Sequence, residues 1–359
     1  AADTRRHQQC RDNPALKPAM PADEVTAFLA TQACAAIRFR TASELCGEAL
    51  SNGGQRQLQT LLLDDPLVHK ILASQTADGW LGQRFHGYDS LESGIRILCE
   101  KGLDRHHPGL VKAVEAVCDQ GDRISAEMGT FGSFADSQRL GGTQLIRAVV
   151  LAYAGLKEHS LVQAQIEPVL AAFQAVLDYQ QPADFLENFK NRWVLKSGCL
   201  LPGIYHLRLL AYTHNWRSEE NIAMVAGAIQ RLVELAPLPP YYLRRSSQLI
   251  APASYATLDY TFSNEISADL WADWFLRMEL LARMGILNAV PELQTQALIL
   301  KAMLADNQGW FPLALQKSYF HLWGAYTGLA LEADWRKASR RRNDLTFRSR
   351  LILRYAGLD

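Results

Sequence analysis

Apolar residues recur along this chain at positions i, i+3, i+4 and i+7, and no long stretch alternates apolar and polar residues. The first spacing is typical of amphipathic helices, whereas alternation would indicate half-buried strands. In "SLESGIRILCEKG", for example, Leu91, Ile95 and Leu98 lie on one stripe, and Gly102 follows as a helix stop. The pattern therefore predicts an all-α fold.

The predicted helices come in pairs separated by short polar breaks. Pro108 and Pro291 stand at first helical positions, where proline is favoured, and Ser218 stands at an N-cap. A helix near 23–38 precedes six pairs: 42–51 with 64–75, 90–102 with 107–118, 141–156 with 161–179, 202–213 with 218–235, 267–285 with 291–304, and 319–335 with 345–357.

Hairpins that recur at intervals of about 50 residues are a repeat signature, because each hairpin needs its neighbours to bury its faces. Six hairpins closed into a ring form an α/α toroid, or (α/α)6 barrel, whose inner helices begin at one rim. We expect residues 1–359 to form one such domain. Residues 1–22 would be an extended N-terminal arm, and residues 236–265 a long rim loop.

Composition limits the classes of protein to consider. Apolar residues make up 48% and charged residues 21% of the chain, and Lys+Arg and Asp+Glu balance at 37 each. This balance gives no reason to expect a nucleic acid partner, and no apolar run reaches the roughly 18 residues of a transmembrane helix. The N-terminus lacks the apolar core of a signal peptide, and the six cysteines form no CxxC pair. We therefore expect a cytoplasmic protein with reduced thiols.

A turn of the form Gln-x-x-Asp-Gly-Trp joins a predicted outer helix to the next inner helix. It occurs as "QTADGW" at 75–80, and a variant, "LADNQGWFPL", occupies an equivalent position at 304–313. Glycine permits a left-handed turn, and tryptophan can pack across the ends of adjacent hairpins. Trp80 and Trp310 are therefore expected at the same end of the ring.

This repeated turn resembles the Gln-Trp repeats of squalene–hopene cyclases and the hairpin ends of protein prenyltransferase β subunits. The resemblance implies an α/α toroid that binds an isoprenoid-type substrate. It also implies terpene cyclase-like or prenyltransferase-like activity, as a lyase, isomerase or transferase.

The family's catalytic motifs are incomplete in this chain. "HLWGAYTGL" matches the prenyltransferase motif in which a zinc-binding histidine, here His321, is followed after six residues by Gly328-Leu329. Asp269 stands where the zinc-binding aspartate would fall, but Trp271 occupies the cysteine position, and tryptophan does not bind zinc. The D-x-D-D and D-D-x-x-D motifs are absent. We expect no metal and no cofactor.

Histidine, tyrosine and acidic residues near predicted helix starts are the catalytic candidates, because their side chains can transfer protons near neutral pH. The candidates are His86, Tyr88, Asp89, His206, Asp269 and His321. Structural roles stay open for some of them. Asp89 and Glu92 have the spacing of a capping box, and either Tyr205 or His206 could be a buried helix residue.

A second set of residues near the predicted rim could contact a substrate. This set comprises Cys199, Tyr205, Tyr260, Glu265, Trp271 and Tyr319. Cys199 could instead be a packed thiol, and Glu265 a solvated loop residue. The basic run "WRKASRRRNDLTFRSRLILR" at 335–354 leads into a predicted outer helix, so we expect it on a solvated or lipid-facing surface away from the cavity mouth.

These features favour an enzyme that binds a mainly apolar small molecule in a central cavity. Rim acid–base groups would then drive cyclisation, isomerisation, hydration or elimination. One alternative is a carbohydrate-active (α/α)6 hydrolase or lyase whose paired carboxylates would be Asp89 and Asp269. Another is a non-enzymatic binding scaffold whose centre is filled by large side chains.

Overall fold

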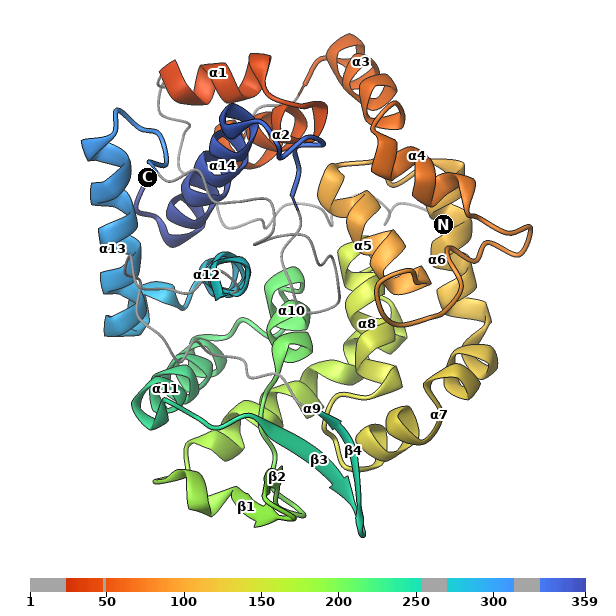
Figure 1. The fold of residues 1–359 in the computed structure, drawn as a ribbon, viewed down its shortest axis with the longest axis vertical. Coiled ribbons are helices and arrows are strands. Elements are labelled where there is room, and N and C mark those ends of the chain that lie inside the picture. Colours follow the sequence, from red (N-terminus) through yellow and green to blue (C-terminus); the bar gives the residue numbers. More distant parts are fainter. Residues whose placement is uncertain (1–23, 48–49, 253–269, 313–329) are drawn as a thin grey trace, which may run out of the picture.

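The computed structural model describes residues 24–47, 50–252, 270–312 and 330–359. These residues are mostly helical, which confirms the all-α expectation in broad terms (Figure 1). A small four-stranded sheet is an addition that the hydrophobic pattern did not predict. Among the described helices, none combines the length and apolar character needed to cross a bilayer.

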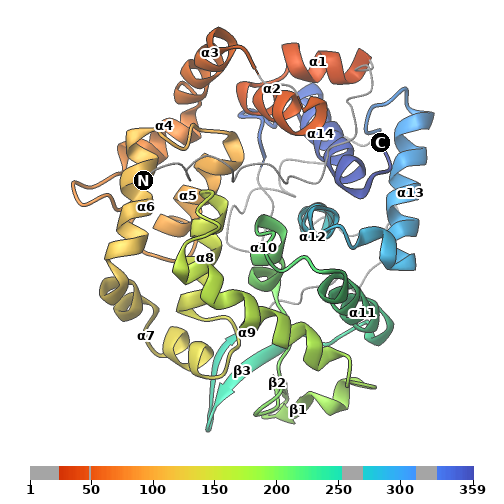
Figure 2. The same ribbon diagram turned by 180° about the vertical axis from the view of Figure 1, so that it is seen from behind.

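One set of helices lies nearer the centre of the molecule, and its members are buried on most sides (Figures 1 and 2). This central set comprises α2 (Ala35–Arg40) with its π-helical continuation η1 (Thr41–Cys46), α5 (Leu91–Lys101), α8 (Thr143–Tyr153), α10 (Ile204–Tyr212), α12 (Leu270–Met284) and α14 (Ala338–Ala356). Helix α5 packs on α8, α8 on α10, α10 on α12, and α12 on α14. Helix α14 reaches η1, and α2 touches α5, so the contacts run in a cycle.

The remaining helices surround the central set and alternate with it along the chain (Figure 1). They are α1 (Glu24–Gln32), α3 (Asn52–Leu63), α4 (Pro66–Ala73), α6 (Pro108–Asp119), α7 (Gly121–Ser137), α9 (Ser160–Val176), α11 (Glu219–Leu235) and α13 (Pro291–Asp306), with short turns η2 (Pro182–Asp184) and η3 (Leu287–Ala289). Prolines open α6 and α13, and Ser218 caps α11, as predicted.

Helix α14 corrects the prediction for the end of the chain. It was expected to be an outer helix, yet Phe347, Leu351 and Ile352 have no exposed surface. The basic run also does not form a solvated surface throughout, because Arg348 is buried and pairs with acidic side chains. Arg348 therefore belongs to an interior ion pair, and its charge does not indicate a solvent-facing side of the helix.

The small sheet lies at one edge of the molecule and contains two hairpins (Figure 1). Strands β1 (Leu186–Phe189) and β2 (Arg192–Leu195) pair antiparallel, as do β3 (Tyr241–Arg245) and β4 (Gln248–Pro252), and β2 pairs with β3 in parallel. The second hairpin occupies part of the predicted loop 236–265, so that prediction was wrong for residues 241–252. Burial alternates along β3 but not along β2, where two exposed residues precede two buried ones, so the sheet gives no consistent period of two in the sequence.

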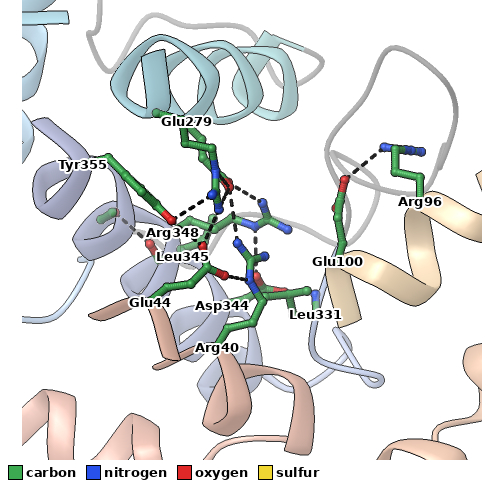
Figure 3. Close-up of polar contacts among 12 residues, drawn as sticks. Arg40, Glu44, Arg96, Glu100, Glu279, Leu331, Asp344, Leu345, Arg348 and Tyr355 are labelled. Atoms are coloured by element: carbon green, nitrogen blue, oxygen red, sulfur yellow. Dashed lines mark hydrogen bonds and ion pairs between the residues drawn. The ribbon is translucent and has the colours of Figure 1, made fainter. Parts of the chain in front are cut away.

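Ion pairs in the interior link three parts of the central set: the continuous helix formed by α2 and η1, helix α12, and helix α14 (Figure 3). Arg40 Nη2 lies 3.3 Å from Glu279 Oε1, and Arg348 Nη1 lies 3.6 Å from the other oxygen of that carboxylate. Arg283 Nη2 lies 2.5 Å from Glu44 Oε2. Burial alone would raise the pKa of Glu44, but Arg283 and Arg40 lower it far below its ordinary value. These carboxylates therefore join the helices as anions.

The two tryptophan turns share a left-handed glycine but differ in their neighbours. Gly79 (φ +88°) lies against Lys112 of α6, whereas Gly309 (φ +84°) lies closest to Arg350 of α14 and also near Val25 of α1. The guanidinium carbon of Arg123 lies 3.7 Å from the centre of the Trp80 ring, and that of Arg342 lies 4.5 Å from the centre of the Trp310 ring. The location of both turns at one end of a ring stays a prediction.

We expect Gly79→Ala to lower the free energy of unfolding by about 2 kcal/mol, since its backbone is left-handed and a Cβ would lie 2.3 Å from Lys112 O. Gly285→Ala is the matched control. Gly285 has a similar φ of +78°, but no heavy atom of the described residues lies within 4 Å of its added Cβ. Chemical denaturation of both variants measures the difference. Equal losses would show that the turn at Gly79 does not pack tightly against α6.

Candidate active site around Glu92

A buried carboxylate, Glu92, joins His86 and Tyr205 at the start of α5. His86 Nδ1 lies 2.6 Å from Glu92 Oε2, and the Tyr205 hydroxyl donates to Glu92 Oε1 at 2.5 Å. The same hydroxyl lies 3.4 Å from His86 Nδ1. Three groups that can carry protons therefore meet at one point, and we call them the Glu92 trio.

Local folding explains why Glu92 points inward. Ser90 caps α5 by accepting from Ser93 N at 3.1 Å, and Ser93 Oγ accepts from Ser90 N at 3.2 Å. The capping box is therefore Ser90 with Ser93, and the prediction of Asp89 with Glu92 was wrong. Since the serines satisfy the helix start, the Glu92 side chain is available to contact His86 in the preceding segment.

The electrostatics of the trio favour an ionised Glu92. Burial alone would raise the pKa of this carboxyl, but its hydrogen bonds with His86 and Tyr205 and the nearby charge of Arg208 lower it below the ordinary value. A carboxylate beside Nδ1 favours the tautomer in which Nδ1 carries the proton. Nε2 is then the basic nitrogen of the imidazole.

His86 is the member of the trio that reaches solvent. Its side chain is 22% exposed, whereas that of Glu92 is 2% exposed. It lines a pocket of about 360 Å³ that combines charged and apolar side chains, formed by Arg84, His86, Glu127, Met128 and Phe131. Glu127 Oε2 accepts from Phe85 N at 2.7 Å, which fixes the segment beside His86. The pocket can therefore present a ligand to the imidazole.

Arg208 lies one turn after Tyr205 in α10 and has no exposed surface. Its guanidinium carbon is 5.4 Å from the centre of the Tyr205 ring. Burial would lower its pKa, but Tyr153, Tyr205 and Glu92 raise it, so the group is a cation. Within the described part of the chain, none of its three nitrogens has a hydrogen-bond partner.

The next layer of the interior is also charged. Arg96, one turn after Glu92 in α5, is buried, and its Nη1 lies 3.6 Å from Glu100 Oε1 (Figure 3). The rings of Tyr153 and Tyr212 contact each other in a tilted arrangement, with ring centres 4.0 Å apart. The described interior is thus lined by charged and phenolic groups as well as apolar ones.

The structure brings together two predicted site residues, His86 and Tyr205, and separates others from them. Tyr88 is 63% exposed, and Asp89 is also exposed, so neither joins the buried trio. His206 is buried, and its Nδ1 accepts from Gly203 N at 3.1 Å. Burial lowers the pKa of His206 to about 4, which makes it a neutral residue of the helix start.

Two further predicted site residues, Trp271 and Cys199, make contacts that serve packing. Trp271 is buried among aromatic rings, with those of Trp274, Phe275 and Phe311 within 6.2 Å. Cys199 is half-buried, and its thiol donates to Asp184 O at 3.7 Å. The remaining predicted site residues, Tyr260, Glu265, Asp269, Tyr319 and His321, lie outside the described residues.

Sequence reasoning missed three residues of this region. Glu92 was interpreted mainly as a cap and was not among the predicted site residues, and Arg208 and Glu127 were not considered. Arg208 could have been found from its position three residues after Tyr205, because this spacing puts both side chains on one helix face. Glu127 belongs to α7, which has a non-helical residue at Gly129 (φ +52°), and no pattern in the sequence links it to His86.

Among the described residues, no group of three or more His, Cys, Asp and Glu side chains is arranged to hold a metal ion. Comparison with protein-family models, curated proteins and solved structures found no match to this chain.

Proposed function

We propose that this chain is an enzyme that transfers protons to and from a small, mainly apolar substrate, with His86 as base and Tyr205 as acid. The observation that carries this proposal is the ionised, buried Glu92, whose two oxygens contact His86 and Tyr205 separately. A buried carboxylate that orients both an imidazole and a phenol is typical of acid–base sites.

We further propose that the central helices close an α/α toroid. The support is the cyclic order of contacts, from α2 through α5, α8, α10, α12 and α14 to η1. In this architecture, His86 and Tyr205 approach each other from the starts of two central helices.

The chemistry fits an elimination or an isomerisation. In an elimination, His86 Nε2 takes a proton from a substrate carbon, and the C–H electron pair becomes a new double bond. The leaving oxygen departs with the proton of Tyr205. The imidazolium then passes its Nδ1 proton to the phenolate 3.4 Å away, and exchange with solvent through the pocket moves the remaining Nε2 proton back to Nδ1. The reverse sequence is a hydration.

The substrate class rests on the pocket and on the resemblance. Met128 and Phe131 supply apolar surface next to His86, while Arg84 and Glu127 supply polar groups. An unsaturated isoprenoid-type molecule would place its hydrocarbon chain against Met128 and Phe131. Such a molecule also has allylic C–H bonds, whose protons are the ones an isomerisation or elimination removes.

The test is an incubation of the protein with geraniol and with geranic acid in D₂O, followed by mass spectrometry. We expect deuterium on carbon or a new alkene product with at least one compound. His86→Ala should slow this reaction by about 10²-fold or more, the usual contribution of a general base. His106→Ala is the control, because His106 is exposed and lines a different pocket. A His86→Ala protein as active as the parent chain would contradict the role of His86.

A further inference from the structure

We infer that Arg208 binds a carboxylate group of the substrate, one helical turn beneath the Glu92 trio. This inference rests on the proposed function, because it names the substrate class of that same site. It adds a single negative charge to the mainly apolar molecule proposed above.

The first observation is the contrast between Arg208 and the other buried arginines of the described residues. Each of the others has at least one hydrogen bond or ion pair. The pairs are Arg40 with Glu279, Arg96 with Glu100, Arg147 with Val117 O, Arg277 with Asp273, and Arg348 with Asp344. Arg208 is buried as deeply, yet its three nitrogens have no hydrogen-bond partner among the described residues. Buried charged groups normally have partners, so this exception points to a ligand.

The second observation is that neighbouring carboxylates already have partners. Both oxygens of Glu92 are hydrogen-bonded, to His86 and Tyr205, and Glu100 pairs with Arg96. These carboxylates act on Arg208 only through their charge. The guanidinium therefore has donors that a bound anion could use.

Charge and shape favour a carboxylate over a phosphate. The guanidinium fork matches the two oxygens of a carboxylate. A phosphate dianion would bring a second negative charge into an interior that already holds Glu92 and Glu100. A carboxylate also suits the chemistry, because neutralising it with Arg208 makes a proton on the neighbouring carbon easier to remove.

Tyr205 lies between the pocket residue His86 and Arg208. His86 lines the pocket and contacts Tyr205, whose ring lies 5.4 Å from the Arg208 guanidinium. Since neither Tyr205 nor Arg208 lines that pocket, the inferred ligand would have to extend its carboxylate beyond the pocket, past Tyr205, to reach Arg208. Its reacting carbons would lie near the imidazole and the phenol.

The test is calorimetric titration of the full chain with geranate, with geraniol and with inorganic phosphate at equal ionic strength. Geranate and geraniol share one hydrocarbon chain and differ in the charged group. We expect geranate to bind at least tenfold more tightly than geraniol, and phosphate to bind more weakly than geranate. Geraniol binding as tightly as geranate, or phosphate binding more tightly, would overturn the inference.

Two variants, Arg208→Met and Arg208→Lys, test whether Arg208 is the residue that binds geranate. Arg208→Met should lose geranate affinity at least tenfold and should raise the melting temperature without ligand by about 2 °C, since a buried charge without a hydrogen-bond partner is removed. Arg208→Lys keeps the charge but loses the fork, so we expect a smaller loss of geranate affinity. Arg56→Met, at an exposed position in α3, is the control and should bind as the parent chain does.

Each result decides between a ligand site and a structural role. Unchanged geranate affinity in Arg208→Met, or in Arg208→Lys if the first variant does not fold, would overturn the inference. His86→Ala should slow the exchange by about 10²-fold or more, whereas Arg208→Met should weaken geranate binding. If the parent chain binds geranate through Arg208 but alters neither compound, the proposed function fails while the carboxylate site stands.

Discussion

Asp344→Ala is expected to lower the free energy of unfolding by about 4 kcal/mol, the largest effect of any substitution considered for this chain. Asp344 has no exposed surface and holds two parts of the structure together. Its Oδ2 accepts from Leu331 N at 2.6 Å and from Glu332 N at 3.2 Å. Its Oδ1 accepts from Arg348 Nε at 3.0 Å.

The loss comes from groups that stay buried after the substitution. Leu331 N and the Trp335 indole N–H would lose their acceptor, and the Arg348 guanidinium would lose its closest anion. Buried donors and charges without partners are costly. Asp344→Asn should cost less, because it keeps an acceptor oxygen while removing the charge.

Urea unfolding of the variants measures this effect. The control is Asp359→Ala, because Asp359 pairs with Arg354 at 3.1 Å but its side chain is 43% exposed. Exposed pairs of this kind contribute little, so we expect a change of no more than about 0.5 kcal/mol. If Asp344→Ala lost less than about 1 kcal/mol, the segment before α14 would be held by other contacts.

Helix starts and stops could be predicted from the sequence because they depend on local chemistry. Pro108 and Pro291 open helices, Ser218 caps one, and Gly102 ends one in a left-handed conformation, as expected. Each of these residues has a conformational or hydrogen-bonding preference that neighbours in sequence do not alter.

Features that depend on distant partners could not be predicted in this way. The hairpin order predicted α14 as an outer helix and its basic run as a solvated surface, because Glu279, the partner of Arg348, lies on another helix and is invisible to a periodicity argument. Glu92 was assigned to a cap for the same reason, since its contact with Tyr205 joins residues 113 positions apart. The competing Ser90–Ser93 cap was visible in the sequence but was not weighed.

The rival functions now differ in what they must explain. A carbohydrate-active enzyme was expected to use Asp89 with Asp269, but Asp89 is exposed, and Asp269 lies outside the described residues. A non-enzymatic binding scaffold could also hold a carboxylate at Arg208, but it gives no role to the contacts that join Glu92 to both His86 and Tyr205. The Glu92 trio and Arg208 are accounted for together by proton transfer on a carboxylate-bearing molecule, which is why we favour it.

The free energy of unfolding should depend on pH because His206 is buried and neutral in the folded chain. Its pKa is lowered from 6.5 to about 4 by burial, so the folded chain keeps it neutral between these values. The unfolded chain binds a proton in the same range. Stability is therefore fully present above about pH 6.5 and falls as the pH drops towards 4, by up to about 3 kcal/mol in total. Carboxyls with lowered pKa, such as Glu92 and Glu279, lose their contribution only at lower pH.

His206→Asn should remove most of this slope while keeping the helix start, because an asparagine oxygen can accept from Gly203 N as His206 Nδ1 does. Denaturation curves of the parent chain and the variant between pH 7 and pH 4 measure the difference. His214→Asn is the matched control: partial desolvation and the nearby charges of Arg217 and Lys157 also lower the pKa of His214 to about 4, but its side chain is exposed to solvent, so screening should make its effect smaller. If the parent chain and His206→Asn lost stability in parallel over this range, His206 would have to be protonated in the folded chain. The buried, neutral role assigned to it at the start of α10 would then be wrong.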